Sequence, residues 1–121
     1  MINSGVGLNP GWITFYADGS DGGSVFGDVN SKKTYVSIIK LSEFINEPVD
    51  LIKMNIEGME AEVIEDLQPK MHLINEFIIE YHAFSSLPQT LDKILSIFDK
   101  HGFKYFVAPV FHGEPYCPFN P

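Results

Sequence analysis

Short apolar runs alternate along the chain with segments in which apolar residues recur at helical spacing. The runs are rich in β-branched and aromatic residues, which favour strands. They predict strands at residues 12–17, 34–39, 50–56, 76–82 and 104–111. Helical spacing predicts helices at 59–67 and 87–100, and Gly102 is expected to end the second one as a left-handed cap. This alternation indicates an α/β fold with a mainly parallel sheet flanked by helices.

The run at 76–82 has a continuous apolar centre and polar residues only toward its end. Such a strand is typical of a sheet that is covered on both faces, so we expect Ile78 to be buried. Leu95 lies in the middle of the apolar stripe of the second helix and is expected in the core as well. We expect 50–56, 76–82 and 104–110 to share one sheet, with the first two parallel.

Polar residues gather where two of these strands end. The segment that starts at Val49 reads as strand, tight turn and helix, with Gly58 in the turn. Polar groups at the carboxyl ends of neighbouring strands face the crevice in which α/β proteins bind ligands. His82 closes the strand at 76–82 in the same way. The candidate catalytic residues are therefore Asn55, Glu57, Glu60 and His82.

Each candidate also has a structural interpretation. Glu57 and Glu60 stand where a carboxylate favours the positive end of a helix dipole, and Glu57 is a candidate helix cap. Asn55 cannot act as a base, but it can donate and accept hydrogen bonds. His82 is a candidate base or metal ligand, although a lone histidine beside aromatic residues is often structural. The remaining histidines show no ligand spacing, so no metal site is expected.

Composition and charge narrow the class of protein. The chain has 121 residues, enough for a single domain, and residues 113–121 are expected to form an irregular tail. Its net charge is −8 and no basic patch is visible, so nucleic acid is not an expected partner. No apolar run approaches the roughly 20 residues that span a bilayer, so no membrane association is expected. A single cysteine fits a reducing compartment, which favours a cytoplasmic protein.

The same segment that carries the candidate residues resembles the signature of the FkbM-type methyltransferases. The matching residues are Asp50, Leu51, Ile52, Lys53, Glu57, Gly58 and Glu60. Asn55 departs from the signature, because the family usually has aspartate there. The resemblance implies a partial Rossmann-like fold and an S-adenosylmethionine-dependent O-methyltransferase. Its acceptor would be a sugar or another small hydroxylated molecule.

The resemblance covers most of the chain, but it corresponds only to the second, C-terminal half of a family member's catalytic domain. The glycine-rich cofactor loop of the first half has no counterpart, and Gly5-Val6-Gly7 reads as a plain turn. We therefore expect a fragment, a truncated gene product or one part of a split enzyme. The 121 residues alone are not expected to bind S-adenosylmethionine with useful affinity. A homodimer or a separate chain that supplies the missing half is an expected partner. The other interpretation is a non-catalytic α/β binding or interaction module built on the same scaffold.

Overall fold

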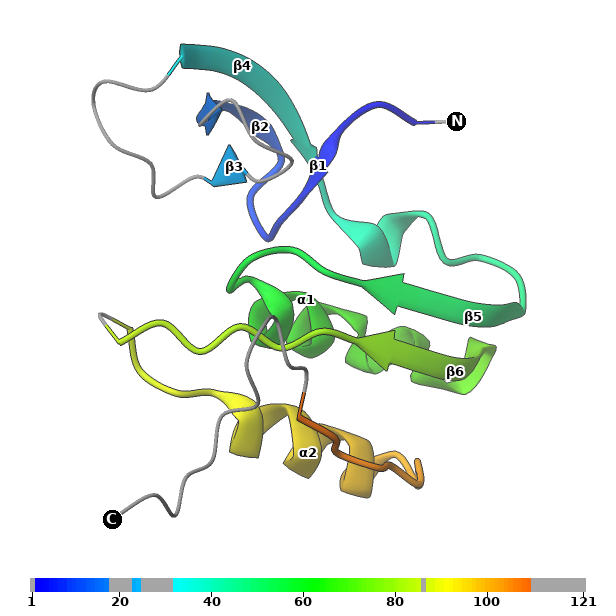
Figure 1. The fold of residues 1–121 in the computed structure, drawn as a ribbon. Coiled ribbons are helices and arrows are strands. Elements are labelled where there is room, and N and C mark those ends of the chain that lie inside the picture. The colour runs from blue at the N-terminus through cyan, green and yellow to red at the C-terminus, as the bar shows by residue number, and fades with distance from the viewer. Residues whose placement is uncertain (1, 18–22, 25–31, 86, 110–121) are drawn as a thin grey trace, which may run out of the picture.

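The computed structural model of the protein describes residues 2–17, 23–24, 32–85 and 87–109, which form a mixed α/β structure (Figure 1). The tail expected at 113–121 lies outside these residues. In chain order the elements are β1 (Gly5–Val6), β2 (Gly11–Ala17), β3 (Gly23–Ser24), β4 (Lys32–Ile39), the 3₁₀ turn η1 (Leu41–Glu43), β5 (Val49–Met54), α1 (Glu60–Leu67), the 3₁₀ segment η2 (Gln68–Leu73), β6 (Ile74–Ile79) and α2 (Leu91–Lys100). The expected strands at 12–17, 34–39, 50–56 and 76–82 are thus present as β2, β4, β5 and β6.

The strands form two small sheets rather than one mainly parallel sheet. The larger sheet has the order β1-β4-β2-β3, in which β2 is antiparallel to both of its neighbours and only β1 is parallel to β4. Parallel neighbours need a long crossover connection, usually a helix, and the described residues contain none between β2 and β4. The expectation of a mainly parallel sheet is therefore wrong for the described residues. Gly5-Val6, expected in a turn, is instead the short strand β1, which pairs with Ile38 and Ile39.

The second sheet consists of β5 and β6, which run parallel as the sequence predicts. The chain crosses over between them through α1 and η2, which supply the connection that parallel strands require. Met54 pairs with Ile79 at the last position of each strand. The segments that follow the two strands therefore begin side by side, and this register creates the candidate site.

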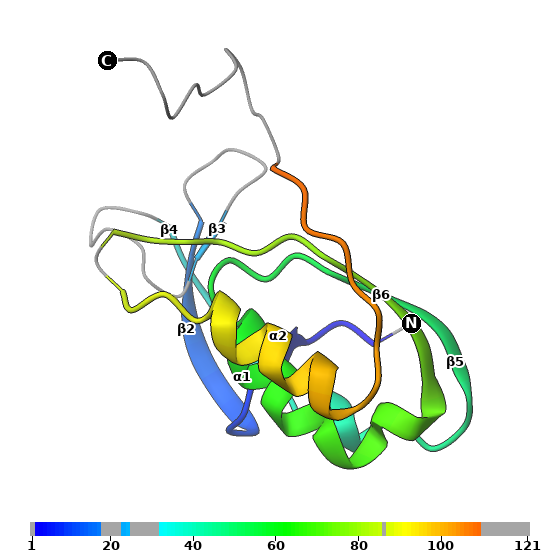
Figure 2. The ribbon, with the colours of Figure 1, turned by 90° about the horizontal axis from the view of Figure 1, so that it is seen from below.

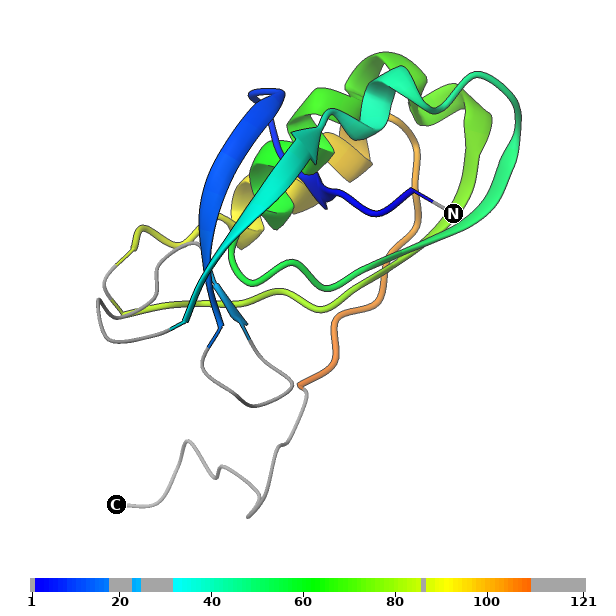
Figure 3. The ribbon, with the colours of Figure 1, turned by 90° about the horizontal axis from the view of Figure 1, so that it is seen from above.

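Both helices lie on the same side of the β5–β6 pair, as Figures 2 and 3 show. Their apolar faces meet the strands and each other, because residues at helical spacing share one face. The buried core consists of Ile45, Met54, Ala61, Val63, Ile64, Leu67, Met71, Ile74, Ile94, Ile97 and Phe98. None of the helices in this described part of the chain is long and apolar enough to cross a membrane.

The opposite face of β5 and β6 is open. Ile78 is 56% exposed and Leu51 is 47% exposed. The expectation that Ile78 is buried is wrong, because both helices pack on one face and leave the strand covered on one side only. Leu95 is only partly buried, since α2 turns Ile94 and Phe98 most directly toward the core.

The chain beyond α2 follows the predicted stop signal but not the predicted strand. Gly102 has a φ of 79°, and its N–H donates to the Asp99 carbonyl at 3.1 Å. The Phe103 N–H reaches back to the Phe98 carbonyl at 3.0 Å, which completes the expected left-handed cap. Residues 104–109 then form no strand, so the strand expected at 104–111 is wrong over that range, and 110–111 lie outside the described residues.

Candidate active site

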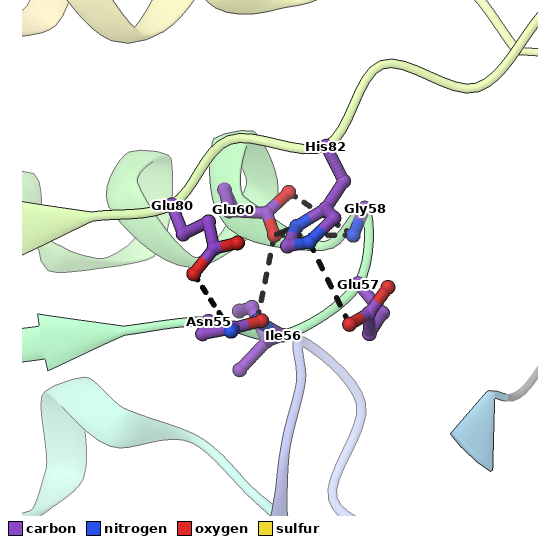
Figure 4. A network of polar contacts seen from close by, with 7 residues as sticks. All are labelled: Asn55, Ile56, Glu57, Gly58, Glu60, Glu80 and His82. Carbon is purple, nitrogen blue, oxygen red and sulfur yellow. Dashed lines mark hydrogen bonds and ion pairs between the residues drawn. The ribbon is translucent and has the colours of Figure 1, made fainter. Parts of the chain in front are cut away.

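The chain leaves β5 and β6 as two adjacent segments that carry polar side chains (Figure 4). The Glu80 amide donates to the Met54 carbonyl at 2.9 Å, which extends the strand pairing by one step. Asn55 Nδ2 then donates to Glu80 Oε2 at 3.0 Å. Parallel pairing thus brings the two groups of polar residues to the same end of the sheet, as expected from the sequence.

A tight turn connects β5 to α1. Gly58 has a φ of 101°, which residues with a side chain rarely adopt. A Cβ atom at this position would also lie 2.9 Å from Phe84 Cε2. Glu57 has a φ of 54° and is the only non-glycine residue with positive φ in the described ranges. Gly58 adopts its positive φ without strain, whereas Glu57 holds a left-handed conformation that the surrounding contacts must stabilise.

The Glu60 carboxylate is the centre of this turn. Glu60 is 0% exposed, and its carboxylate accepts hydrogen bonds from the Gly58 N–H at 3.1 Å and from the Ile56 N–H at 3.4 Å. It also contacts His82 Nδ1 at 3.0 Å. Glu60 is the first residue of α1, where a negative charge favours the helix dipole. One carboxylate therefore joins the turn, the start of α1 and the segment after β6.

His82 lies between two carboxylates. Its Nδ1 is 3.0 Å from Glu60 Oε1, and its Nε2 is 3.6 Å from Glu57 Oε1. Partial burial lowers the pKa of His82, but the hydrogen bond to Glu60 and the charges of Glu57, Glu60 and Glu80 outweigh this effect. The pKa of His82 is consequently held above its ordinary value of 6.5. The imidazole is a stronger base here than an isolated histidine.

The arrangement suits general base chemistry. When Nδ1–H donates to Glu60, the neutral imidazole carries its free electron pair on Nε2. Nε2 can then accept a proton from a hydroxyl group placed beside it. The distance of 3.6 Å to Glu57 is too long for a hydrogen bond, but the carboxylate stabilises the imidazolium that forms. In this arrangement Glu60 positions the ring and His82 carries the proton.

A cavity of about 200 Å³ opens beside His82. It is lined by Gly58, Met59, Glu62, His82, Phe84, Leu87, Pro88 and Thr90. The rings of His82 and Phe84 stack with their centroids 6.3 Å apart. The helix expected at 87–100 begins only at Leu91, because the Thr90 N–H donates to the Tyr81 hydroxyl at 2.8 Å. The residues before α2 therefore form a wall of the cavity rather than a helical turn.

A larger cavity of about 640 Å³ lies elsewhere, between β6, α2 and the segment after α2. Aromatic and aliphatic side chains such as Phe77, Phe98 and Phe103 form most of its walls. It contains none of the His82, Glu57 and Glu60 cluster. Of these two cavities, the smaller one therefore adjoins the cluster of His82, Glu57 and Glu60.

The structure gathers all four residues that the sequence singles out. The interpretation of Glu57 as a helix cap is wrong, because Met59 is the N-cap of α1 and no side chain caps it. Sequence reasoning missed Glu80 and Glu62. Glu80 could have been found, since it lies with His82 near the end of the strand predicted at 76–82, whereas Glu62 carries no signal that separates it from an exposed helical glutamate. No set of three or more metal-ligating side chains is arranged for a metal ion within the described ranges.

Comparison with protein families places the chain in a class of enzyme. The family model of the methyltransferase FkbM domain matches residues 3–105. The chain therefore belongs to the FkbM methyltransferase family. Comparisons with curated proteins and with solved structures find no match.

Family membership implies S-adenosylmethionine as the methyl donor. The described residues fit the reacting end of this cofactor, because carboxylates of Glu57 and Glu80 lie near His82 and attract a positively charged sulfonium group. They do not provide a glycine-rich loop between a strand and a helix for the other end of the cofactor. Gly5 and Gly7 lie in and after β1, and the next element is β2 rather than a helix.

Proposed function

We propose that the chain serves in the transfer of a methyl group from S-adenosylmethionine to a hydroxyl group of a sugar or another small hydroxylated molecule. When bound, this cofactor supplies an electrophilic methyl group on a sulfonium sulfur that leaves as a neutral thioether. The proposal is carried by one observation. In a chain of the FkbM methyltransferase family, His82 is held by the buried Glu60 at 3.0 Å beside a cavity at the carboxyl ends of two parallel strands.

The residues have different roles in this proposal. His82 accepts the hydroxyl proton on Nε2, which makes the acceptor oxygen nucleophilic. Glu60 fixes the ring and its tautomer, and Glu57 stabilises the imidazolium through its charge. Asn55 supports the site by holding Glu80 through the hydrogen bond of 3.0 Å.

Methyl transfer to a panel of hydroxylated acceptors tests these roles. The tagged chain would be purified under native conditions with any protein that associates with it, and methylated products would be detected by mass spectrometry. His82→Asn should lower the rate by about 10²–10⁴, as expected for loss of a general base. Glu57→Gln should have a smaller effect, because it removes a charge and leaves the base in place. A His82→Asn variant with the wild-type rate would contradict the assignment.

We further propose that another polypeptide covers the open face of β5 and β6. It would be a second copy of this chain, or a separate chain that carries the other half of the domain and supplies the cofactor loop. The exposed Leu51 and Ile78 support this proposal, as does the edge of β5, which pairs only with β6 among the described residues. Sedimentation of the natively purified complex checks it, and a monomer with slow amide exchange along β5 would contradict it.

A second candidate function is a binding module without catalysis. The observation that favours it is Asn55, which replaces the family's usual aspartate and donates to Glu80 instead of acting as a base. This alternative predicts ligand binding beside His82 with no methylated product. The rate of methyl transfer by the natively purified complex distinguishes the two candidates, because a binding module methylates no acceptor.

A further inference from the structure

The segment that follows β6 returns toward the turn before α1, and hydrogen bonds fix it at two places. The Thr90 N–H donates to the Tyr81 hydroxyl at 2.8 Å, which closes a loop between these two residues. Within this loop the Leu87 N–H donates to the Phe84 carbonyl at 3.1 Å. The backbone at Phe84 is therefore held in place, which limits where its side chain can lie.

The Phe84 ring lies against two parts of the site at once. A Cβ atom at Gly58 would lie 2.9 Å from Phe84 Cε2 and 3.2 Å from Phe84 Cδ2, so the ring packs directly on the backbone of this turn. The ring is also stacked with the ring of His82, with centroids 6.3 Å apart and an angle of 20° between the planes. Stacked aromatic pairs attract each other at centroid separations of about 4.5–7 Å. One aromatic ring thus joins the turn to the candidate base.

The hydrogen bond to Glu60 leaves one motion of the His82 ring unrestrained (Figure 4). It holds the ring at Nδ1 alone, at 3.0 Å, and Nε2 is 3.6 Å from Glu57 Oε1, too far for a hydrogen bond. A ring held at one atom can tilt about that atom, and Nε2 then changes its position. A stacked neighbour opposes this motion, because tilting separates atoms of the two rings that are in contact.

We propose that Phe84 is a positioning residue for His82. Its ring holds the imidazole in the plane in which Nδ1 bonds Glu60, and so keeps Nε2 in one place. Gly58 belongs to the same arrangement, since a side chain at that position would displace the Phe84 ring. The effect of Phe84 on methyl transfer rests on the proposed function, whereas its effect on the ring of His82 does not.

NMR of the His82 ring in the full chain tests the proposal. At a pH where the ring is neutral, long-range proton–nitrogen correlation spectra show which ring nitrogen carries the proton. We expect the Nδ1–H tautomer in the wild type, since Nδ1 contacts Glu60. Phe84→Leu should add the other tautomer, because a ring that tilts away from Glu60 can carry its proton on either nitrogen. Phe84→Tyr keeps an aromatic ring and should retain the wild-type spectrum.

Two further substitutions separate stacking from other effects. Leu87→Ala removes a side chain from the wall of the cavity beside His82 and leaves the stacked pair in place. Phe44→Leu changes another partly exposed phenylalanine, which does not line this cavity. Both variants should show the wild-type tautomer. A second tautomer in either control or in Phe84→Tyr, or an unchanged tautomer in a folded Phe84→Leu variant, would overturn the proposal.

A measurement on the wild type covers the case in which Phe84→Leu does not fold. Carbon-13 relaxation of the imidazole rings compares His82 with the exposed His72 and His101. The His82 ring should be as rigid as the backbone around it, and nuclear Overhauser effects should connect its protons to those of Phe84. A ring as mobile as those of the two exposed histidines, or one without these effects, would overturn the proposal.

The rate of methyl transfer by the natively purified complex separates this inference from the proposed reaction. Phe84→Leu should lower the rate about tenfold to a hundredfold, because a displacement of about 1 Å at the reacting groups can have an effect of this size. A tautomer that depends on Phe84, without methyl transfer by the wild type, would contradict the reaction and support the positioning role. Methyl transfer at the wild-type rate by Phe84→Leu, with an unchanged tautomer, would contradict the positioning role and support the reaction.

Discussion

Glu60 and Glu62 lie two positions apart in the first turn of α1, and their carboxylates meet opposite surroundings. Glu60 is fully buried, and backbone N–H groups of the preceding turn and His82 Nδ1 surround its carboxylate. Glu62 is less buried as a residue, but its Oε2 has neither solvent contact nor a hydrogen-bond donor within the described residues.

The difference shows why burial alone does not decide what a carboxylate does for the fold. Burial of Glu60 is compensated within the chain, so this residue organises the turn and the ring of His82. Burial of the Glu62 oxygen is not compensated by the described residues, so this oxygen is expected to destabilise the fold rather than to organise it. The hydrogen bonds that a carboxylate accepts therefore indicate its role better than its exposed area does.

The largest expected effect on stability follows from removing the Glu60 carboxylate, which accepts hydrogen bonds within the chain. Glu60→Ala leaves the buried N–H groups of Ile56 and Gly58 without an acceptor and His82 without its orienting partner. The free energy of unfolding should fall by about 3 kcal/mol, as measured by urea denaturation. Glu65→Ala in the same helix is the control and should change little, because its side chain is exposed. A loss below about 1 kcal/mol for Glu60→Ala would contradict the structural role of its carboxylate.

A smaller loss of stability is expected from a substitution in the turn that the Glu60 carboxylate stabilises. Gly58→Ala places a side chain at a φ of 101° and against Phe84, and should cost about 1–3 kcal/mol in chemical denaturation. Gly102→Ala is the matched control, since it has a φ of 79° but no atom within 4 Å of the added Cβ. We expect Gly58→Ala to be the more destabilising of the two. Equal losses would show that the contact with Phe84 is unimportant.

The pH dependence of stability is expected to report the pairing of His82 with Glu60. The pKa of His82 is raised in the folded state above its ordinary 6.5, which the unfolded chain retains. The stabilisation is therefore complete below pH 6.5 and is lost as pH rises through the folded-state pKa. His82→Asn should remove this part of the pH profile in denaturation experiments. A profile unchanged by the substitution would contradict the ionic contact.

The smallest effect is expected at the exposed pair of α1 and α2. Lys93 Nζ lies 2.6 Å from Glu65 Oε2, and both side chains are nearly half exposed. Glu65→Gln should shift the melting temperature only slightly, and added salt should abolish the shift by screening the charges. A large fall in melting temperature that persists at high salt would contradict this expectation. It would show that the short distance of an ion pair, rather than burial and hydrogen bonding, decides how much a carboxylate of this helix stabilises the fold.

Local signals account for what could be predicted from the sequence. β-branched and aromatic runs located β2, β4, β5 and β6, and Gly102 marked the end of α2 with its positive φ. The candidate site could also be assembled in outline, because polar residues at the ends of parallel strands meet at one edge. Asn55, Glu57, Glu60 and His82 were found this way, and the parallel pairing of β5 with β6 brings them together.

By itself, the sequence of this protein determined the strands β2, β4, β5 and β6, the end of α2, its family signature and the residue types at the site, because each depends on neighbours a few positions away. Only the tertiary structure decided that β2 and β4 pair antiparallel, that Ile78 is exposed and that Glu60 contacts His82 across 22 positions. It also decided that one oxygen of Glu62 is buried without a donor among the residues that the structure describes. These features depend on which strands pair and on which face the helices cover, and both are decided by contacts between residues that are distant in the chain.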